Sequence, residues 1–144
     1  MKIRQVVLAR QTDGAGQLAA QLAPLAEIDP QLLLVFGNGG FLTTPAFLEA
    51  IAGTFPEAFR LGCSTAGEIA TARAHDESCV VTAVAFEHGS LKGVSADLPA
   101  MEGSFDAGRS IGEQLAGDGL RAVLVYGRGT EVNGSALLRG LTAV

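Results

Sequence analysis

Residues 79–86 decide the fold. They read Cys79-Val80-Val81-Thr82-Ala83-Val84-Ala85-Phe86 and are apolar on both of the faces that a strand presents. Such a run is typical of a central strand that is covered on both sides. Two further apolar runs, Leu32 to Phe36 and Ala122 to Tyr126, also have the length of a strand. All three are far shorter than the roughly 20 residues that a membrane-spanning helix needs. The sequence therefore predicts a buried β-sheet and no membrane segment.

Strand and helix signals alternate on both sides of this stretch. Leucines that share one helical face over 18–25 predict a helix that Asp13 caps and that Pro24 and Pro30 end. The other predicted strands are at 3–9, 32–36, 59–62, 91–98 and 121–126. Three further helices are predicted: one that Thr44 caps and that runs through Ile51, one that Ser104 caps and Asp118-Gly119 ends, with Phe105 on its inner face, and one from about Ser135. This alternation indicates an α/β fold with a mixed, mainly parallel sheet of about six strands flanked by helices.

One antiparallel hairpin is expected within that sheet. His88-Gly89-Ser90 has the composition of a tight connection between the strands at 79–86 and 91–98. In the second of these strands, apolar residues alternate with polar or small ones, as they do in a strand with one buried face. We therefore expect these two strands to lie side by side and antiparallel.

Length and charge limit the possible functions. The chain has 144 residues and no evident linker, repeat or low-complexity tract, so one continuous domain over 1–144 is expected. A net charge of −5, with the basic residues scattered, argues against nucleic acid as a partner. The N-terminal apolar stretch between Arg4 and Arg10 is too short for a secretion signal, which favours a cytoplasmic location.

The two cysteines are predicted to be structural. Cys63 and Cys79 form no Cys-x-x-Cys pair, and a disulfide would be unusual in the cytoplasm. We expect two buried thiols and no metal site.

Three polar loops that follow predicted strands are candidate ligand sites, because α/β sheets bind ligands beyond the carboxyl ends of their strands. These loops are Gly37 to Phe41, Gly62 to Glu68 and Gly127 to Gly134. The second is the richest in hydrogen-bonding groups, and the residues from Arg73 to Ser78 could close over it. The predicted ligand-binding residues are Gly62, Cys63, Ser64, Thr65, Gly67, Glu68, Arg73 and His75.

The same loop carries a family resemblance. Residues 62–69, Gly-Cys-Ser-Thr-Ala-Gly-Glu-Ile, resemble the hallmark segment of FIST domains, and the resemblance extends to Ser78–Phe86 and to Asn133–Leu141. It covers nearly the whole chain and implies the N-terminal part of a FIST domain. FIST domains are sensory modules of signalling proteins that are presumed to bind small molecules such as amino acids. The resemblance thus implies a ligand-binding module without enzymatic activity that acts on an output partner such as a kinase, a cyclase or a chemoreceptor.

Two alternatives stay open. Some FIST proteins resemble haem-dependent nitric oxide sensors, so haem is a possible cofactor with His75 as the iron ligand; otherwise no cofactor is expected. A hydrolase that uses Cys63 or Ser64 as its nucleophile would require a general base, and the sequence offers none at a recognised spacing.

Family members continue past the position of Val144, and no capping residue closes the last predicted helix. We therefore expect a truncated chain whose exposed apolar surface leads to self-association.

Overall fold

The structure, a computed structural model, describes residues 1–9 and 14–144. The chain forms two compact units, Met1–Leu91 (unit 1) and Lys92–Val144 (unit 2). No helix among the described residues is long and apolar enough to cross a membrane.

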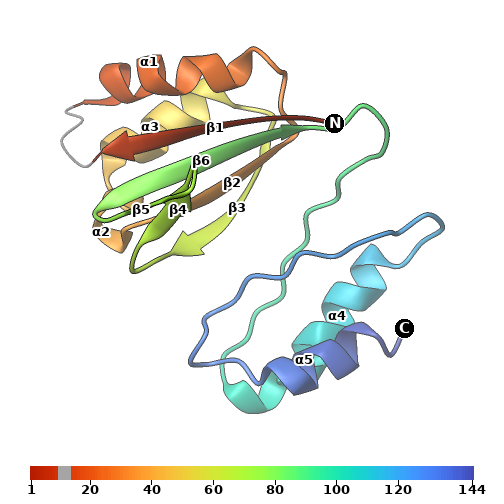
Figure 1. Ribbon diagram of the computed structural model, residues 1–144. Helices are drawn as coiled ribbons and strands as arrows, with labels where there is room; N and C mark the ends of the chain where they lie inside the picture. Colours follow the sequence, from red (N-terminus) through yellow and green to blue (C-terminus); the bar gives the residue numbers. More distant parts are fainter. Residues whose placement is uncertain (10–13) are drawn as a thin grey trace. The chain divides into compact units, whose positions relative to one another are not determined.

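Unit 1 contains a four-stranded mixed sheet with the order β1-β6-β2-β3 (Figure 1). The strands are β1 (Lys2–Ala9), β2 (Leu32–Gly37), β3 (Phe59–Ser64) and β6 (Ser78–Ala85). β6 lies between β1 and β2 and is antiparallel to both, while β2 and β3 are parallel. The α/β class and the mixed sheet are confirmed, and β6 is the central strand that its two apolar faces predicted. Only one pair is parallel, because β6 enters the sheet in the reverse direction.

Helices α1 (Ala15–Ala26) and α3 (Pro45–Thr54) pack together on one face of this sheet (Figure 1). Thr44 caps α3 as predicted, whereas the predicted cap Asp13 lies outside the described residues. Pro24 does not end α1 but lies in its last turn, where its carbonyl accepts a hydrogen bond from Arg4 Nη1 at 2.8 Å. The core between helices and sheet includes Leu8, Leu18, Leu22, Leu33, Val35, Phe47, Ile51, Cys79, Val81 and Ala83.

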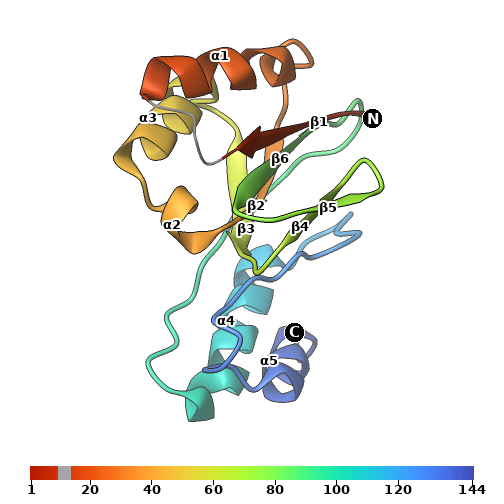
Figure 2. The same cartoon turned by 60° about the vertical axis from the view of Figure 1, so that its left-hand side comes forward.

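A separate hairpin of β4 (Glu68–Ala70) and β5 (Arg73–His75) lies on the side of the sheet away from α1 and α3 (Figure 2). Its turn residues Thr71 and Ala72 both have positive φ, as type I′ hairpin turns require, although glycine or asparagine adopts this conformation more easily. Ile69 is 80% exposed on this hairpin. Within residues 1–9 and 14–144, the hairpin is therefore at 68–75, and not at 79–98 as predicted.

Unit 2 contains a short helix η1 (Met101–Gly103) and two longer helices, α4 (Ser104–Leu115) and α5 (Gly134–Leu141), which pack against each other. The predicted strands at 91–98 and 121–126 are not formed, and no strand follows β6 among the described residues. A strand requires a hydrogen-bonded neighbour, and neither segment has one in the part of the chain that the structure describes. The predicted hairpin at His88 is wrong for the same reason.

Helix α4 begins differently from the prediction. Ser104 is its first residue rather than its cap, and its hydroxyl donates to the Met101 carbonyl at 2.6 Å. The same hydroxyl oxygen accepts from the backbone N–H of Asn133, the residue that caps α5. The buried face of α4 is formed by small residues, Ala107, Gly108 and Gly112, so that Phe105, predicted on that face, is partly exposed.

Candidate functional site

The candidate site lies at one end of the sheet of unit 1, where the ends of three neighbouring strands lie side by side. β2 and β3 end there, and β6 begins there because it runs in the opposite direction. The backbone N–H of Thr65 donates to the Gly37 carbonyl at 2.9 Å, and that of Asn38 donates to the Ser78 carbonyl at 2.9 Å. The sheet therefore joins the predicted loops at 37–41 and 62–68, and the start of β6, into one region.

A buried carboxylate connects these elements. Glu68 is only 3% exposed, and its Oε1 accepts a hydrogen bond from Thr65 Oγ1 at 2.6 Å. Its Oε2 accepts from the hydroxyl of Ser78, which is also buried. Thr65, Glu68 and Ser78, which we name the Glu68 cluster, thus link the end of β3, the first residue of β4 and the first residue of β6. Thr65 and Ser78 thus supply hydrogen-bond partners for both oxygens of the buried Glu68 carboxylate.

The environment keeps the Glu68 carboxylate ionised. Burial raises the pKa of Glu68, but hydrogen bonds from the Ser78 and Thr65 side chains and from the Ser78 backbone, with the charge of His75, bring it below its ordinary value of 4.5. Burial, with the negative charge of Glu68, raises the pKa of the Cys79 thiol to about 12. Cys79 is therefore a neutral core thiol, as the sequence predicted.

The Glu68 cluster predicts how stability depends on pH. Because the pKa of Glu68 is lower in the folded than in the unfolded protein, its stabilising contribution is present above pH 4.5 and is lost as the pH falls through the folded pKa. Ser78→Ala removes one donor to the carboxylate and is expected to cost about 1.5–3 kcal/mol at pH 7. Urea unfolding of both proteins from pH 7 to pH 3 measures the effect. A smaller difference at pH 3 than at pH 7 is expected, whereas a difference independent of pH would contradict an ionised Glu68.

The outer residues of the predicted site are accessible. Cys63, Ser64, Gly67 and Arg73 are all exposed. The prediction of a buried thiol is wrong for Cys63, because β3 is an edge strand of the sheet and most of its residues are exposed. Gly39, the first residue of the short helix α2 (Gly39–Leu42), lies close to Ser64, since a β-carbon on this glycine would be 3.6 Å from Ser64 Cβ. Ser64 is thus held beside the loop that follows β2, whereas Arg73 pairs with Ala70 next to the turn of the hairpin.

His75 is paired with Glu68 across the hairpin. Its side chain is partly buried, and its Nε2 atom is buried without a hydrogen-bond partner among the described residues. A buried polar atom without a partner costs about 1–3 kcal/mol. His75 is therefore the polar group at this site whose hydrogen bonding is incomplete.

The two glycines of the segment have different roles. Gly62 lies inside β3, and a β-carbon there would overlap the carbonyl oxygen of Val35 on β2. A β-carbon on Gly67 would make only an ordinary contact, 3.4 Å from Asp76 Oδ1. Close approach of two strands thus explains Gly62, whereas packing does not explain Gly67.

Ser78 and Asn38 contribute to this site although neither was among the predicted ligand-binding residues. Ser78 was expected only as part of a covering segment, but it donates to Glu68 and pairs with Asn38. The position of Ser78 directly before the central strand was the feature of the sequence that could have indicated its role in the site. Asn38 caps α2 by accepting from the Gly40 N–H at 2.9 Å, and so shapes the loop beside Ser64.

The fold and this site define an α/β domain that fixes a polar, glycine-containing loop at one end of its sheet. A family model described as the FIST N domain matches residues 31–144. The chain belongs to this family, whose members are sensory modules of signalling proteins. No curated protein and no solved structure matches the chain at a significant level.

Proposed function

We propose that the chain is the ligand-binding module of a cytoplasmic signalling protein and that it binds a small polar molecule, such as an amino acid, at 62–68 together with Arg73 and His75. The Glu68 cluster carries this proposal. By holding Thr65 from inside, it fixes the backbone of the loop while Ser64 and Gly67 stay exposed. A loop that is ordered before its ligand arrives loses less conformational entropy on binding.

The chemistry of the exposed groups suits a zwitterionic ligand. The guanidinium of Arg73 can bind a carboxylate, and the Ser64 hydroxyl can donate or accept a hydrogen bond. The Nε2 atom of His75 gains a partner if a ligand or a movement of the hairpin brings one to it. Binding at the hairpin would change its structure. A signalling output partner, such as a kinase, a cyclase or a chemoreceptor, would detect that change.

Substitutions that remove two neighbouring hydroxyl groups, those of Ser64 and Thr65, distinguish a role in ligand binding from a role in folding. Ser64→Ala removes an exposed hydroxyl, so it is expected to weaken ligand binding about tenfold while stability stays within about 0.5 kcal/mol. Thr65→Val removes a donor to the buried carboxylate, so it is expected to cost about 1.5–3 kcal/mol of stability. A thermal-shift screen with the free amino acids identifies the ligand, and calorimetry with both variants measures affinity. The proposal is wrong if no amino acid raises the melting temperature, or if Ser64→Ala binds as the parent does.

Haem is a second candidate because His75 Nε2 has no partner among the described residues. This nitrogen is buried, however, so iron could reach it only after the hairpin opened. A small polar ligand at the exposed loop requires no such opening, and we favour it. Titration with haem decides between them. A Soret band that His75→Ala abolishes would establish the alternative.

We propose no catalytic step for this site. A hydrolase would need a base that activates Cys63 or Ser64, and His75 Nε2 has no hydrogen-bond partner within the described residues. The carboxylate of Glu68 is already engaged by Thr65 and Ser78.

A further inference from the structure

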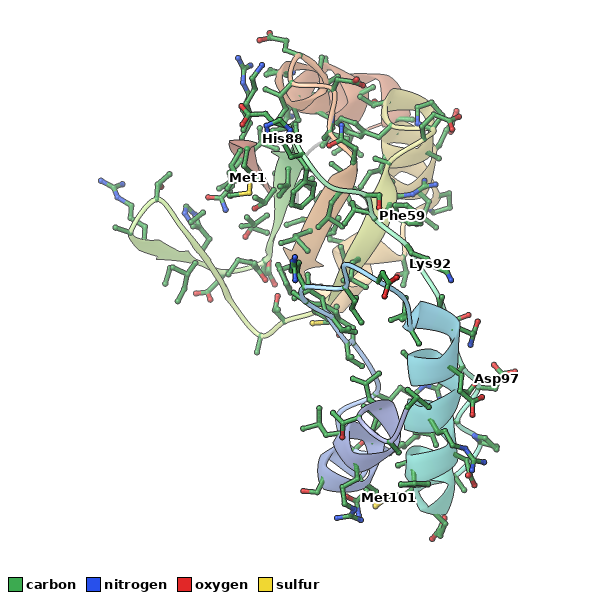
Figure 3. The ribbon with its side chains drawn as sticks, turned by 90° about the vertical axis from the view of Figure 1, so that its right-hand side faces the viewer. Met1, Phe59, His88, Lys92, Asp97 and Met101 are labelled. Atoms are coloured by element: carbon green, nitrogen blue, oxygen red, sulfur yellow. The ribbon has the colours of Figure 1, made fainter. Side chains whose placement is uncertain are left out.

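The β4–β5 hairpin stands apart from the main sheet of unit 1. It forms a two-stranded sheet of its own, and no ladder joins it to the four-stranded sheet among the described residues. The turn end of the hairpin projects from unit 1 (Figure 2 and Figure 3). All residues from 71 to 74 are exposed, so few contacts hold this end of the hairpin in place.

A buried carboxylate anchors the other end of the hairpin. Only Glu68 and Ala70 are buried in the segment 68–75, which the structure describes completely. The Glu68 carboxylate accepts hydrogen bonds from Thr65, before the hairpin, and from Ser78, after it. Several rotatable bonds separate this carboxylate from the backbone of β4, so the backbone can tilt while the hydrogen bonds stay formed. The hairpin is therefore held at its base rather than at its turn.

The segment that leads from the hairpin to β6 is strained. Glu77 has a φ of 49°, in the left-handed region that residues with a side chain rarely adopt. It lies between β5 and β6, outside both strands. Such a conformation costs free energy and persists only where the surrounding structure enforces it. A change of the Glu77 backbone to a negative φ would remove this cost and would tilt the hairpin.

Gly67 lies at the corresponding position before the hairpin. Its φ is not positive, and a β-carbon there would make only ordinary contacts with Asp76 and His75. The projecting position of the hairpin therefore does not require glycine here, although glycine loses more conformational freedom on folding than any other residue. Residues at the ends of a moving element absorb its changes of φ and ψ, and small residues often do so. Gly67 and Glu77 thus have the properties of hinge residues.

A tilt about these hinges would bring polar side chains of the hairpin to the loop. Paired residues of an antiparallel ladder project to the same face, and alternate residues of a strand share a face, so Arg73 and His75 lie on the face of Glu68. Glu68 contacts Thr65, so this face is the one that meets the loop. Arg73 is next to the turn and has the longest path to move. A tilt of the hairpin toward the loop would carry Arg73 toward Ser64.

We propose that the β4–β5 hairpin is a lid, which tilts about Gly67 and Glu77 and closes over the loop at 62–67 when a small zwitterionic ligand binds there. A ligand that contacts Ser64 and Arg73 together binds the closed position better than the projecting one, so it shifts the equilibrium toward closure. Closure is then the structural change that an output partner detects. The choice of ligand rests on the function proposed above, whereas the hinges do not depend on it.

A spin label at the turn tests the lid in the full chain. Ala72→Cys places the label on an exposed residue, and Cys63→Ser removes the exposed native thiol. Cys79 is buried and its pKa is raised to about 12, so it does not react. The label weakens the NMR amide signals of nearby residues. We expect partial weakening at 64–67 in the free protein, because the lid samples closure before the ligand arrives, and loss of these signals with at least one of the free amino acids, added one at a time.

Two substitutions at residues with similar backbone strain provide the matched control. Glu77 and Asp29 have φ values of 49° and 50°, but only Glu77 lies at a proposed hinge. Because glycine tolerates a positive φ, Glu77→Gly should favour the projecting position and restore the signals of 64–67 in the free protein. It should also weaken amino acid binding by about three- to tenfold. Asp29→Gly removes the same charge and should change neither result.

The outcomes distinguish the lid from the ligand. Equal effects of Glu77→Gly and Asp29→Gly in the free protein would overturn the lid. So would an amino acid that binds by calorimetry without further weakening the signals of 64–67. If Glu77→Gly restores these signals but no amino acid binds, the lid stands and the proposed ligand is wrong.

Discussion

Gly140→Ala is expected to unfold unit 2. A β-carbon on Gly140 of α5 would overlap the carbonyl oxygen of Phe105 on α4, and one on Gly108 would overlap the carbonyl oxygen of Leu137. One on Gly112 would lie 2.7 Å from the Leu141 carbonyl oxygen. These are rigid backbone atoms, so the two helices would have to separate. We expect a loss of about 3 kcal/mol or more, because overpacking costs 1–3 kcal/mol even where side chains can adjust.

Gly53→Ala in α3 is the matched control for this substitution. A β-carbon there meets no atom within 4 Å, so alanine should stabilise the helix by about 0.5–1 kcal/mol. Urea unfolding, with hydrogen exchange of 104–115 and 134–141, measures both variants. Rapid exchange in α4 and α5 of the Gly140 variant is expected, with normal exchange in unit 1. A Gly140 variant as stable as the Gly53 variant would contradict the close packing of the helices.

Gly62→Ala is expected to destabilise unit 1 to a similar degree. Its β-carbon would overlap the Val35 carbonyl oxygen within the parallel pair of β2 and β3. The strands cannot move apart without losing their ladder, so we expect a loss of about 3 kcal/mol or more. Thermal unfolding measures the loss.

Gly67→Ala tests the other glycine of the same loop. Its β-carbon would make only an ordinary contact with Asp76, so stability should change by less than about 0.5 kcal/mol. If Gly67→Ala destabilises the protein as strongly as Gly62→Ala, the distinction between a closely packed Gly62 and an unconstrained Gly67 is wrong.

The sequence predicted those helices and strands whose pattern of apolar and capping residues agrees with their burial in the folded protein. The two apolar faces of β6 indicated a central strand, and Thr44-Pro45 placed the start of α3. The strands expected at 91–98 and 121–126 have strand-like sequences but no partner among the described residues. Pairing is a tertiary property, so local periodicity alone could not exclude them.

The candidate site shows the same division. The concentration of polar groups at 62–68 was visible in the sequence, but their partners were not. Glu68 is satisfied by Thr65 nearby and by Ser78, which the fold brings to it when β6 enters the sheet beside β2. The sequence could not show that Glu68 is buried while Ser64 is exposed, because both are polar residues of one short loop.

Chemical-shift mapping by NMR tests most directly whether this loop binds the ligand. The amide spectrum of the ¹⁵N-labelled chain is recorded while the amino acid identified by thermal shift is added. The largest changes are expected at Cys63, Ser64, Ala66, Gly67 and Arg73, with smaller changes in the helices of unit 2. Changes confined to residues 96–99 and 125–138, with none at 62–75, would contradict the account.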